Sequence, residues 1–523
     1  MPIRIVKDRD RSAPDNYPGQ GGGGGGKLPG GINSGCLTAI LPLLFKNPKI
    51  ALVLVAVGAA IYFLGGKNLI QSAAGGDSFS LGADLNEQIY DQAEVFEPLA
   101  DNVKNPMPER VTLEKYTPEP LNQGSQGSCV AWSAAYSART VMYAQQSGKD
   151  PDASAFSPSF LYNQIGLDGC QGSYILRAME NMKQVGALPL REFPYNENDC
   201  SAQPAQSQLQ SAEAYRISGF NRLSKSGDDY KVDMLAVKQN LAQGAPVVIG
   251  MMVGGTFMQG MLGEKVWIPT ADDYNKMGFG GHAMSVIGYD DFLEGGAFQI
   301  MNSWGKEWGE NGFGWIRYKD FDYFVKEAYG MDPMGTTEKQ DESRLQVEFG
   351  LVSYNDDVPD TRNLPAVPLK YKSGNTYTTA EPVKKGDKFK IEVTNSSACY
   401  TYIFGQETDG SSYVLFPYTP KHSPFCGITG TRLFPKDYSL QADNVGSKDY
   451  VAVVVTKKPL DYKALNESIS KSRSGSYSAK VAEALGSQIR NDIDFAEKSG
   501  NVGFDTRVNP DDRIAFIIEV DKR

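Results

Sequence analysis

A glycine- and serine-rich stretch with one cysteine, residues 121–132, constrains the fold of this chain more than any other part of the sequence. It reads LNQGSQGSCVAW and continues into a run of small residues that predicts a helix ending near Gly148. Cys129 then lies at the helix N-terminus, where unpaired N–H groups and the helix dipole favour the thiolate over the thiol. Gln123 lies a short way upstream, and helix burial does not explain it. Its amide can point to the same spot as the Cys129 N–H, which indicates an oxyanion site.

A thiolate nucleophile needs a base, and the chain has two histidines, His282 and His422. His282 stands at the start of an apolar stretch, residues 280–290, that predicts a buried strand. The imidazole also needs a partner that orients it. Asn302 follows about twenty residues later in the sequence NSWG. The order Gln, Cys, His, Asn therefore indicates nucleophilic catalysis by a thiol.

These three segments resemble the papain family of cysteine peptidases, over roughly residues 108–331. The family pattern of Gln, then Gly-Ser, then Cys fits Gln123 and Cys129. Its His-Ala before an apolar strand fits His282, and its Asn-Ser-Trp-Gly begins at Asn302. The resemblance implies that Cys129 attacks a peptide carbonyl and that His282 forms the ion pair and then protonates the leaving amine. Asn302 would orient the imidazole, while Gln123 and the Cys129 N–H would hold the oxyanion.

The resemblance also implies a set of residues that bind substrate: Gly172, Ser173, Gly281 and Trp304. Gly172 and Ser173 stand in a strip that is similar to the family's Cys-Asn-Gly-Gly, whose backbone pairs with the substrate next to the cleaved residue. Gly281 precedes the histidine, where members often have Asp or Asn. Trp304 is expected to shield the contact between His282 and Asn302 from water. No cofactor and no metal ion are expected.

The expected fold class is α+β: a papain-like two-lobed peptidase, with a helical lobe and a β-barrel-like lobe, followed by a β-sandwich-like domain. Beyond residue 345 the apolar pattern changes to period two, which predicts strands, and residues 478–498 predict a helical insertion. Part of this region resembles a bacterial accessory domain of unknown function. The expected organisation is a flexible Gly-rich tail at 1–35, a membrane segment at 36–66, a linker at 67–107, the peptidase at 108–335, a linker at 336–350 and the β-rich domain at 351–523.

The uncharged apolar run at residues 50–64 predicts an uncleaved membrane anchor. Lys and Arg are frequent before this run, whereas none follows Lys67 until Lys104. The positive-inside rule then keeps the tail in the cytoplasm and exports the remainder. We therefore expect a single-pass protein of the inner (cytoplasmic) membrane, with the peptidase and C-terminal domains on the periplasmic or extracytoplasmic side.

Six cysteines suit an exported protein. Cys129 must stay free to act as the nucleophile. Two pairs, Cys170 with Cys200 and Cys399 with Cys426, each fall within one expected domain and could form structural disulfides.

The expected partner is a peptide or protein substrate, and an envelope protein could bind the C-terminal domain. The net charge of −10 gives no support to nucleic-acid binding. Two alternatives to a cysteine endopeptidase are left open. One is a cell-wall peptide hydrolase or transpeptidase with the same triad. The other is a non-enzymatic assembly protein of the envelope on a papain-like fold, in which an epoxide that labels cysteine peptidases should not modify Cys129.

Overall fold

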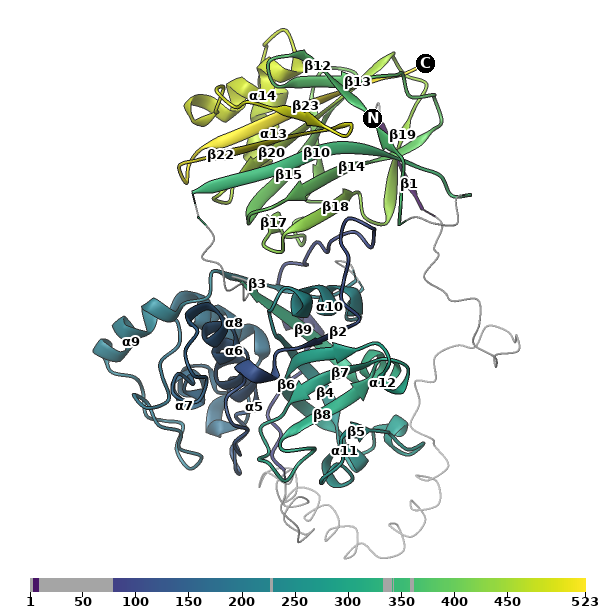
Figure 1. The fold of residues 1–523 in the computed structure, drawn as a ribbon. Coiled ribbons are helices and arrows are strands. Elements are labelled where there is room, and N and C mark those ends of the chain that lie inside the picture. The colour runs from purple at the N-terminus through teal and green to yellow at the C-terminus, as the bar shows by residue number, and fades with distance from the viewer. Residues whose placement is uncertain (1–2, 9–78, 226–228, 333–340, 342, 358–361) are drawn as a thin grey trace, which may run out of the picture. The chain divides into compact units, whose positions relative to one another are not determined.

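The computed structural model describes residues 3–8, 79–225, 229–332, 341, 343–357 and 362–523 (Figure 1). Helices and a mixed sheet make up the part expected to be the peptidase, and the C-terminal part is rich in strands. The expected α+β class is confirmed at this level.

The helix predicted to follow Cys129 is present. It begins as α5 (Cys129–Ala131), passes through a π-helical stretch (Trp132–Arg139) and continues as α6 (Thr140–Ser147). Gly148 ends it in the left-handed conformation, with φ of 66°, where glycine has no Cβ penalty. Figure 1 shows α5 and α6 grouped with α7 (Pro158–Ile165) and α8 (Ile175–Gln184). Alanines on the buried face let α5 and its continuation pack closely on the sheet, where Ser285 Oγ donates to Ser133 O at 2.7 Å.

The sheet of this part has the strand order β3-β9-β4-β6-β7-β8-β5, and β2 also pairs with β6. Its strands are β2 (Arg110–Thr112), β3 (Gly219–Arg222), β4 (Val247–Val253), β5 (Val266–Trp267), β6 (Gly280–Asp290), β7 (Ala297–Met301), β8 (Phe313–Arg317) and β9 (Val325–Asp332). The buried strand predicted at 280–290 is therefore confirmed as β6. The remaining helices here are α9 (Gln206–Ala212), α10 (Met234–Ala242), α11 (Gly255–Gln259) and α12 (Tyr318–Phe324).

Two sheets enclose the core of the C-terminal part, where the period-two pattern predicted strands. One has the order β1-β19-β14-β10-β22-β21 and the other β12-β13-β23-β20-β15-β16. Apolar side chains of both sheets form one cluster, in which Phe349 and Phe516 stack at 4.7 Å between ring centroids. The strands are β1 (Ile3–Lys7), β10 (Arg344–Tyr354), β12 (Leu369–Ser373), β13 (Thr376–Thr379), β14 (Lys388–Asn395), β15 (Cys399–Gln406), β16 (Ser412–Phe416), β19 (Tyr438–Ala442), β20 (Lys448–Thr456), β21 (Ala496–Lys498), β22 (Asn501–Arg507) and β23 (Arg513–Asp521).

The helical insertion differs from the prediction of one helix over 478–498. Two helices are present, α13 (Tyr462–Lys471) and α14 (Tyr477–Leu485). Gly486, with φ of 68°, ends α14 early, and β21 begins within the range that was expected to be helical. Ile489 still packs on the helical cluster, so its apolar spacing reflects burial after the helix has ended.

Two segments that were expected to lack regular structure contain residues of observed strands. Ile3–Lys7, within the expected flexible tail at 1–35, forms β1 and pairs antiparallel with β19. The strand β10 begins at Arg344, inside the expected linker at 336–350. The expected linker at 67–107 contains a short helix, α4 (Glu87–Tyr90), in its described portion.

The predicted single-pass location in the inner membrane is contradicted. In the ranges that the structure describes, no helix is both long and apolar enough to cross a membrane, which takes about 20 residues. The segment expected to span, 36–66, lies outside the described residues. The location predicted from the charge asymmetry around that segment is therefore not retained.

The two expected disulfides have different outcomes. Cys170 and Cys200 are bonded, with 6.0 Å between their Cα atoms, which confirms that prediction. Cys399 and Cys426 face each other on β15 and β17 (Phe425–Cys426), but both are buried free thiols, so the second prediction is wrong. Both sulfurs contact the Thr401 hydroxyl instead, at 3.9 and 3.6 Å.

Candidate active site

The predicted nucleophile lies where the helical part meets the sheet. Cys129 is the first residue of α5, and its Sγ accepts a hydrogen bond from the backbone N–H of Ala283 on β6 at 3.4 Å. The thiol is therefore next to the strand that carries His282. Its side chain is 0% exposed.

The predicted base, His282, is oriented by two neighbours. Its Nε2 lies 2.7 Å from Asn302 Oδ1, and the Trp304 indole stacks on its ring, with 4.3 Å between centroids and 25° between planes. The Nδ1 atom is buried and has no hydrogen-bond partner among the described residues. Because Nε2 is occupied by the amide, Nδ1 is the ring nitrogen left to exchange a proton with a thiol.

Gln123 is held in place by a separate network. Its Oε1 accepts from Ser303 Oγ at 2.6 Å, and its Nε2 donates to Gln126 O at 2.9 Å. Tyr195 Oη donates to the Gln123 carbonyl at 2.7 Å. An amide nitrogen carries two hydrogens, so one N–H is left for an oxyanion. The fixed amide has the preorganisation that such a donor needs.

The predicted thiolate is not the form that this structure favours. Burial raises the pKa of the Cys129 thiol to about 12, against smaller lowering by hydrogen bonds from Ala283 and other backbone groups. Burial likewise lowers the pKa of His282 to about 4, partly offset by the bond to Asn302. Desolvation outweighs the effect of the helix N-terminus, because a buried charge loses its hydration. The pair is therefore a neutral thiol and a neutral imidazole here.

The residues predicted to bind substrate contact a segment of the chain itself, residues 80–84. Ser173 N–H donates to Gly82 O at 2.9 Å, and Ser173 O accepts from Asp84 N–H at 3.0 Å. Gly281 O accepts from the N–H groups of Gly82 and Ala83 at 3.3 and 3.1 Å. The indole N–H of Trp304 donates to Ser80 O at 2.9 Å. At Gly172, with φ of 107°, a Cβ would lie 2.6 Å from Gly82 O.

This segment and the polar residues that support the site are not among the residues predicted from the sequence. Ser303 and Tyr195 hold Gln123, and the buried Glu327 on β9 accepts the N–H of Asn86 at 3.0 Å. A glutamate two positions after Val325 and directly before Ala328, in a strand that is mostly buried, is a signal that could have drawn attention to Glu327. His422, in contrast, is engaged in a loop of the C-terminal part, where its Nδ1 lies 2.9 Å from Thr419 Oγ1.

A metal site is not formed by the part of the chain that the structure describes. Within those residues, no group of three or more His, Cys, Asp or Glu side chains is placed to hold an ion. The chemistry available at this junction is that of a thiol, an imidazole and two amides.

This fold and this set of side chains are those of a cysteine peptidase domain. Residues 108–330 match the family model described as papain family cysteine protease, which supports a papain-family peptidase domain in this segment. Residues 382–459 match the model of a domain of unknown function (DUF4384), which agrees with the resemblance of the C-terminal part.

Individual relatives are distant. An uncharacterized peptidase C1-like protein of Acanthamoeba polyphaga mimivirus is 26% identical over 217 residues, which cover 40% of this chain and 67% of that protein. A cysteine protease of Blomia tropicalis is 27% identical over 198 residues, 37% of this chain and 56% of that protein. The solved structure of xylellain, a cysteine protease from Xylella fastidiosa, is 23% identical, with a TM-score of 0.40 over 49% of this chain and 95% of that chain. The chain thus spans 56–67% of the length of these two curated relatives.

Proposed function

We propose that this protein is a cysteine endopeptidase in which Cys129, His282 and Asn302 form the catalytic triad. The observation that carries the proposal is a pair of contacts made by neighbouring residues of β6. His282 Nε2 lies 2.7 Å from Asn302 Oδ1, and the N–H of the next residue, Ala283, donates to Cys129 Sγ. A nucleophile, a base and a group that orients the base are the parts that covalent acyl transfer needs.

The chemical steps follow from these positions. His282 Nδ1 takes the proton of the Cys129 thiol, and the sulfur attacks the carbonyl carbon of the peptide. The imidazolium then gives its proton to the leaving amine, and a thioester joins the acyl group to Cys129. Water, activated by His282, hydrolyses the thioester and restores the thiol. Asn302 keeps the ring oriented throughout, and Trp304 covers the contact between His282 and Asn302.

The oxyanion that forms on the carbonyl oxygen is assigned to two donors, the Cys129 N–H and the Gln123 amide. The contacts of Gln123 with Ser303 and Gln126 support this role, because they fix the amide before the charge develops. A donor that needs no reorientation stabilises the tetrahedral intermediate more than it stabilises the planar substrate.

Cleavage within chains, rather than at their ends, is supported by the path of residues 80–84. This continuous backbone contacts Trp304 at one end and Ser173 at the other. The site therefore accommodates polypeptide on both sides of the nucleophile, as an endopeptidase requires. Backbone pairing with Ser173 and Gly281 suits a peptide of extended conformation.

Product analysis tests this proposal. The purified chain is incubated with a peptide library, and new termini are identified by mass spectrometry. We expect internal cleavage that the Cys129→Ala chain lacks and that a Cys399→Ala chain keeps, because Cys399 is a buried thiol in the C-terminal core. Products made equally by the Cys129→Ala chain would contradict the proposal. Products joined to a second peptide would instead indicate transpeptidation.

A further inference from the structure

One sheet of the C-terminal part ends in a strand that is distant in sequence from its other strands. Residues 3–7 form β1 and pair antiparallel with β19, from Ile3 opposite Ala442 to Lys7 opposite Tyr438 (Figure 1). In the strand order of this sheet, β1 stands at the end and β19 comes next. Without β1, the N–H and C=O groups along one side of β19 would be open to another strand, because sheet edges pair with extended peptides.

Three consecutive side chains of β1 contribute little to its attachment. Ile5 is 42% exposed, Lys7 is exposed and Val6 is half-buried. The adjacent strand β19, in contrast, adds Leu440 and Ala442 to the apolar core between the two sheets. Hydrophobic stabilisation follows the apolar area removed from water, so these residues of β1 hold the strand less firmly than the core holds β19. Backbone pairing and a polar contact at the end of β1 therefore matter more.

The polar contact is made by Asp8, directly after β1. Its Oδ2 forms an ion pair with Lys390 Nζ on β14, and its Oδ1 accepts from Ser439 Oγ on β19 at 2.6 Å. The backbone N–H of Asp8 donates to Asp437 O at 3.3 Å. Lys390 and Ser439 are 3% and 0% exposed, so a buried cation and a buried hydroxyl bind the two carboxylate oxygens. The contact joins residues 382 positions apart.

Lys390 needs this carboxylate because its other polar partners are neutral. Its Nζ also donates to three backbone carbonyls, those of Pro435 and Lys436 at 3.0 Å and that of Tyr438. In the described ranges, Asp8 is the one acidic side chain that forms an ion pair with it. Burial lowers the pKa of Lys390, and Asp8 opposes that effect. A buried cation is unfavourable without a counter-charge, so the end of β19 favours a strand that supplies a carboxylate.

We propose that β19 and Lys390 form a strand-binding site, whose ligand is an extended peptide with an acidic side chain directly after the paired residues. Residues 3–8 are the ligand bound in this structure. Backbone pairing accepts many sequences, whereas Lys390 and Ser439 select the carboxylate. Both strands of the site, β14 and β19, lie in residues 382–459, which match the domain of unknown function. The proposal goes beyond the proposed function, since no catalytic residue contributes to this site.

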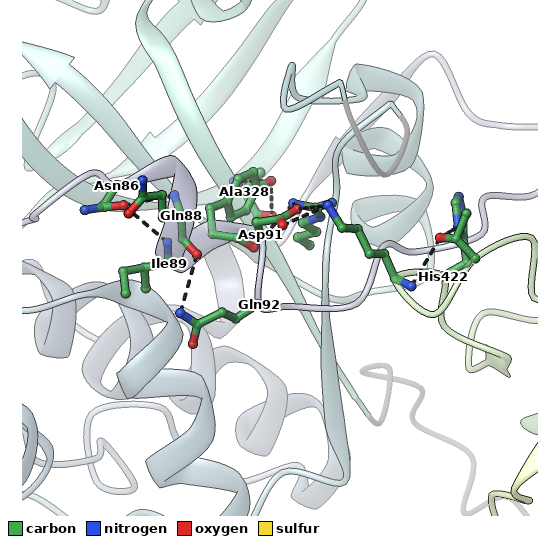
Figure 2. A network of polar contacts seen from close by, with 11 residues as sticks. Asn86, Gln88, Ile89, Asp91, Gln92, Ala328 and His422 are labelled. Atoms are coloured by element: carbon green, nitrogen blue, oxygen red, sulfur yellow. Dashed lines mark hydrogen bonds and ion pairs between the residues drawn. The ribbon is translucent and has the colours of Figure 1, made fainter.

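Amide hydrogen exchange in the full chain tests whether the carboxylate holds the strand. The variant is Asp8→Asn, and the matched control is Asp91→Asn. Figure 2 shows that Asp91 also joins distant segments: it accepts from Arg222 at 3.2 Å and from Lys421 at 2.8 Å. Exchange is measured by mass spectrometry for peptides that contain β1, β19, β20 and β23.

In Asp8→Asn, we expect the amides of β1 and β19 to exchange at least about tenfold faster, because removal of one partner leaves the other charge buried and unpaired. Exchange in β20 and β23 should not change, and Asp91→Asn should leave β1 protected. Unchanged exchange of β1 in Asp8→Asn would overturn the proposal. Faster exchange of all four strands would also overturn it, because a bound ligand is not required for the fold.

Binding of a free peptide tests the same site in a second way. A fluorescent peptide of residues 3–8, amidated at its C-terminus so that Asp8 carries its only carboxylate, is titrated with the Asp8→Asn chain. A second peptide has Asn in place of Asp8. Fluorescence anisotropy should show at least about tenfold tighter binding of the first peptide, because the lost partner of a buried charge pair is costly. The unmodified chain should bind it more weakly, since residues 3–8 already occupy the site.

The chain that carries both Asp8→Asn and Lys390→Met is the control for selectivity. Methionine keeps a long side chain and removes the charge, so the two peptides should bind this chain with equal affinity. Absence of binding to the Asp8→Asn chain, or equal affinity of that chain for both peptides, would overturn the strand-binding site. The readout is binding, so none of these outcomes depends on whether the chain cleaves peptides.

Discussion

His282 Nε2 lies 2.7 Å from Asn302 Oδ1, and both side chains are buried. This bond leaves Nδ1 of the imidazole as the nitrogen that can exchange a proton with Cys129. Asn302 Oδ1 also accepts the backbone N–H of Ser303 at 2.8 Å, so the amide is itself held in one orientation. Proton exchange with Cys129 thus depends on His282, and the orientation of His282 depends on Asn302. This order predicts which substitutions lower the rate of catalysis most.

Replacement of Asn302 by Ala should weaken catalysis less than replacement of His282. The imidazole stays in place, stacked on Trp304, but loses the partner that sets its tautomer and orientation. We expect kcat to fall by less than the roughly 10²–10⁴-fold that general acid–base catalysis contributes. Steady-state hydrolysis of one peptide by both variants measures the ranking. A larger loss in Asn302→Ala than in His282→Ala would contradict it.

Cys129 and His282 should behave as one unit. Either Cys129→Ala or His282→Ala should remove nearly all turnover, and the double variant should lose no more than the worse single variant. The control is His422→Ala, since His422 Nδ1 lies 2.9 Å from Thr419 Oγ1 in a loop of the C-terminal part. Loss of activity in His422→Ala with activity kept in His282→Ala would reverse the assignment of the base.

The amide of Gln123 should act on the chemical step. Gln123→Ala removes one oxyanion donor and should lower kcat by about 10²–10³-fold, with a smaller change in KM. Gln88→Ala is a suitable control, because Gln88 is exposed on α4. A change confined to KM would show that Gln123 binds the substrate in the ground state and does not stabilise the oxyanion.

Glu327 should make the fold less stable as pH rises. Burial raises the pKa of its carboxyl from 4.5 to about 8, so the folded chain keeps a proton that the unfolded chain loses. Its contribution is fully present below pH 4.5 and is lost as pH rises through about 8. Glu327→Gln keeps an acceptor for Asn86 and carries no charge. Its melting temperature should therefore fall less than that of the unmodified chain between pH 4.5 and 8. Parallel pH profiles would contradict the assignment.

The part of the site that could be predicted is the part encoded locally. Cys129, His282 and Asn302 each stand in a short stretch whose composition fits one chemical role, and the helix after Cys129 ends at Gly148 as the glycine indicates. Cys170 and Cys200 are thirty positions apart and pair as expected. Each of these features depends on residues that are close in sequence or on a recognisable motif, so the amino-acid sequence is enough to predict it.

What could not be predicted depends on contacts between distant segments or on burial. Ser80 meets Trp304 across 224 positions, and nothing in the acidic spacer that contains it indicates a cleft. The charge of Cys129 depends on how deeply the folded chain buries it, which a helix N-terminus does not reveal. Cys399 and Cys426 lie opposite each other as a disulfide would require, yet each contacts Thr401 as a free thiol.

The most direct test of the central claim compares the unmodified chain with Cys129→Ala and with Cys399→Ala, since Cys399 is also a buried free thiol. Peptide-library products are identified by mass spectrometry for each chain. We expect internal cleavage by the unmodified chain and by Cys399→Ala, and none by Cys129→Ala. Equal products from the unmodified chain and from Cys129→Ala would contradict the claim that Cys129 is the nucleophile.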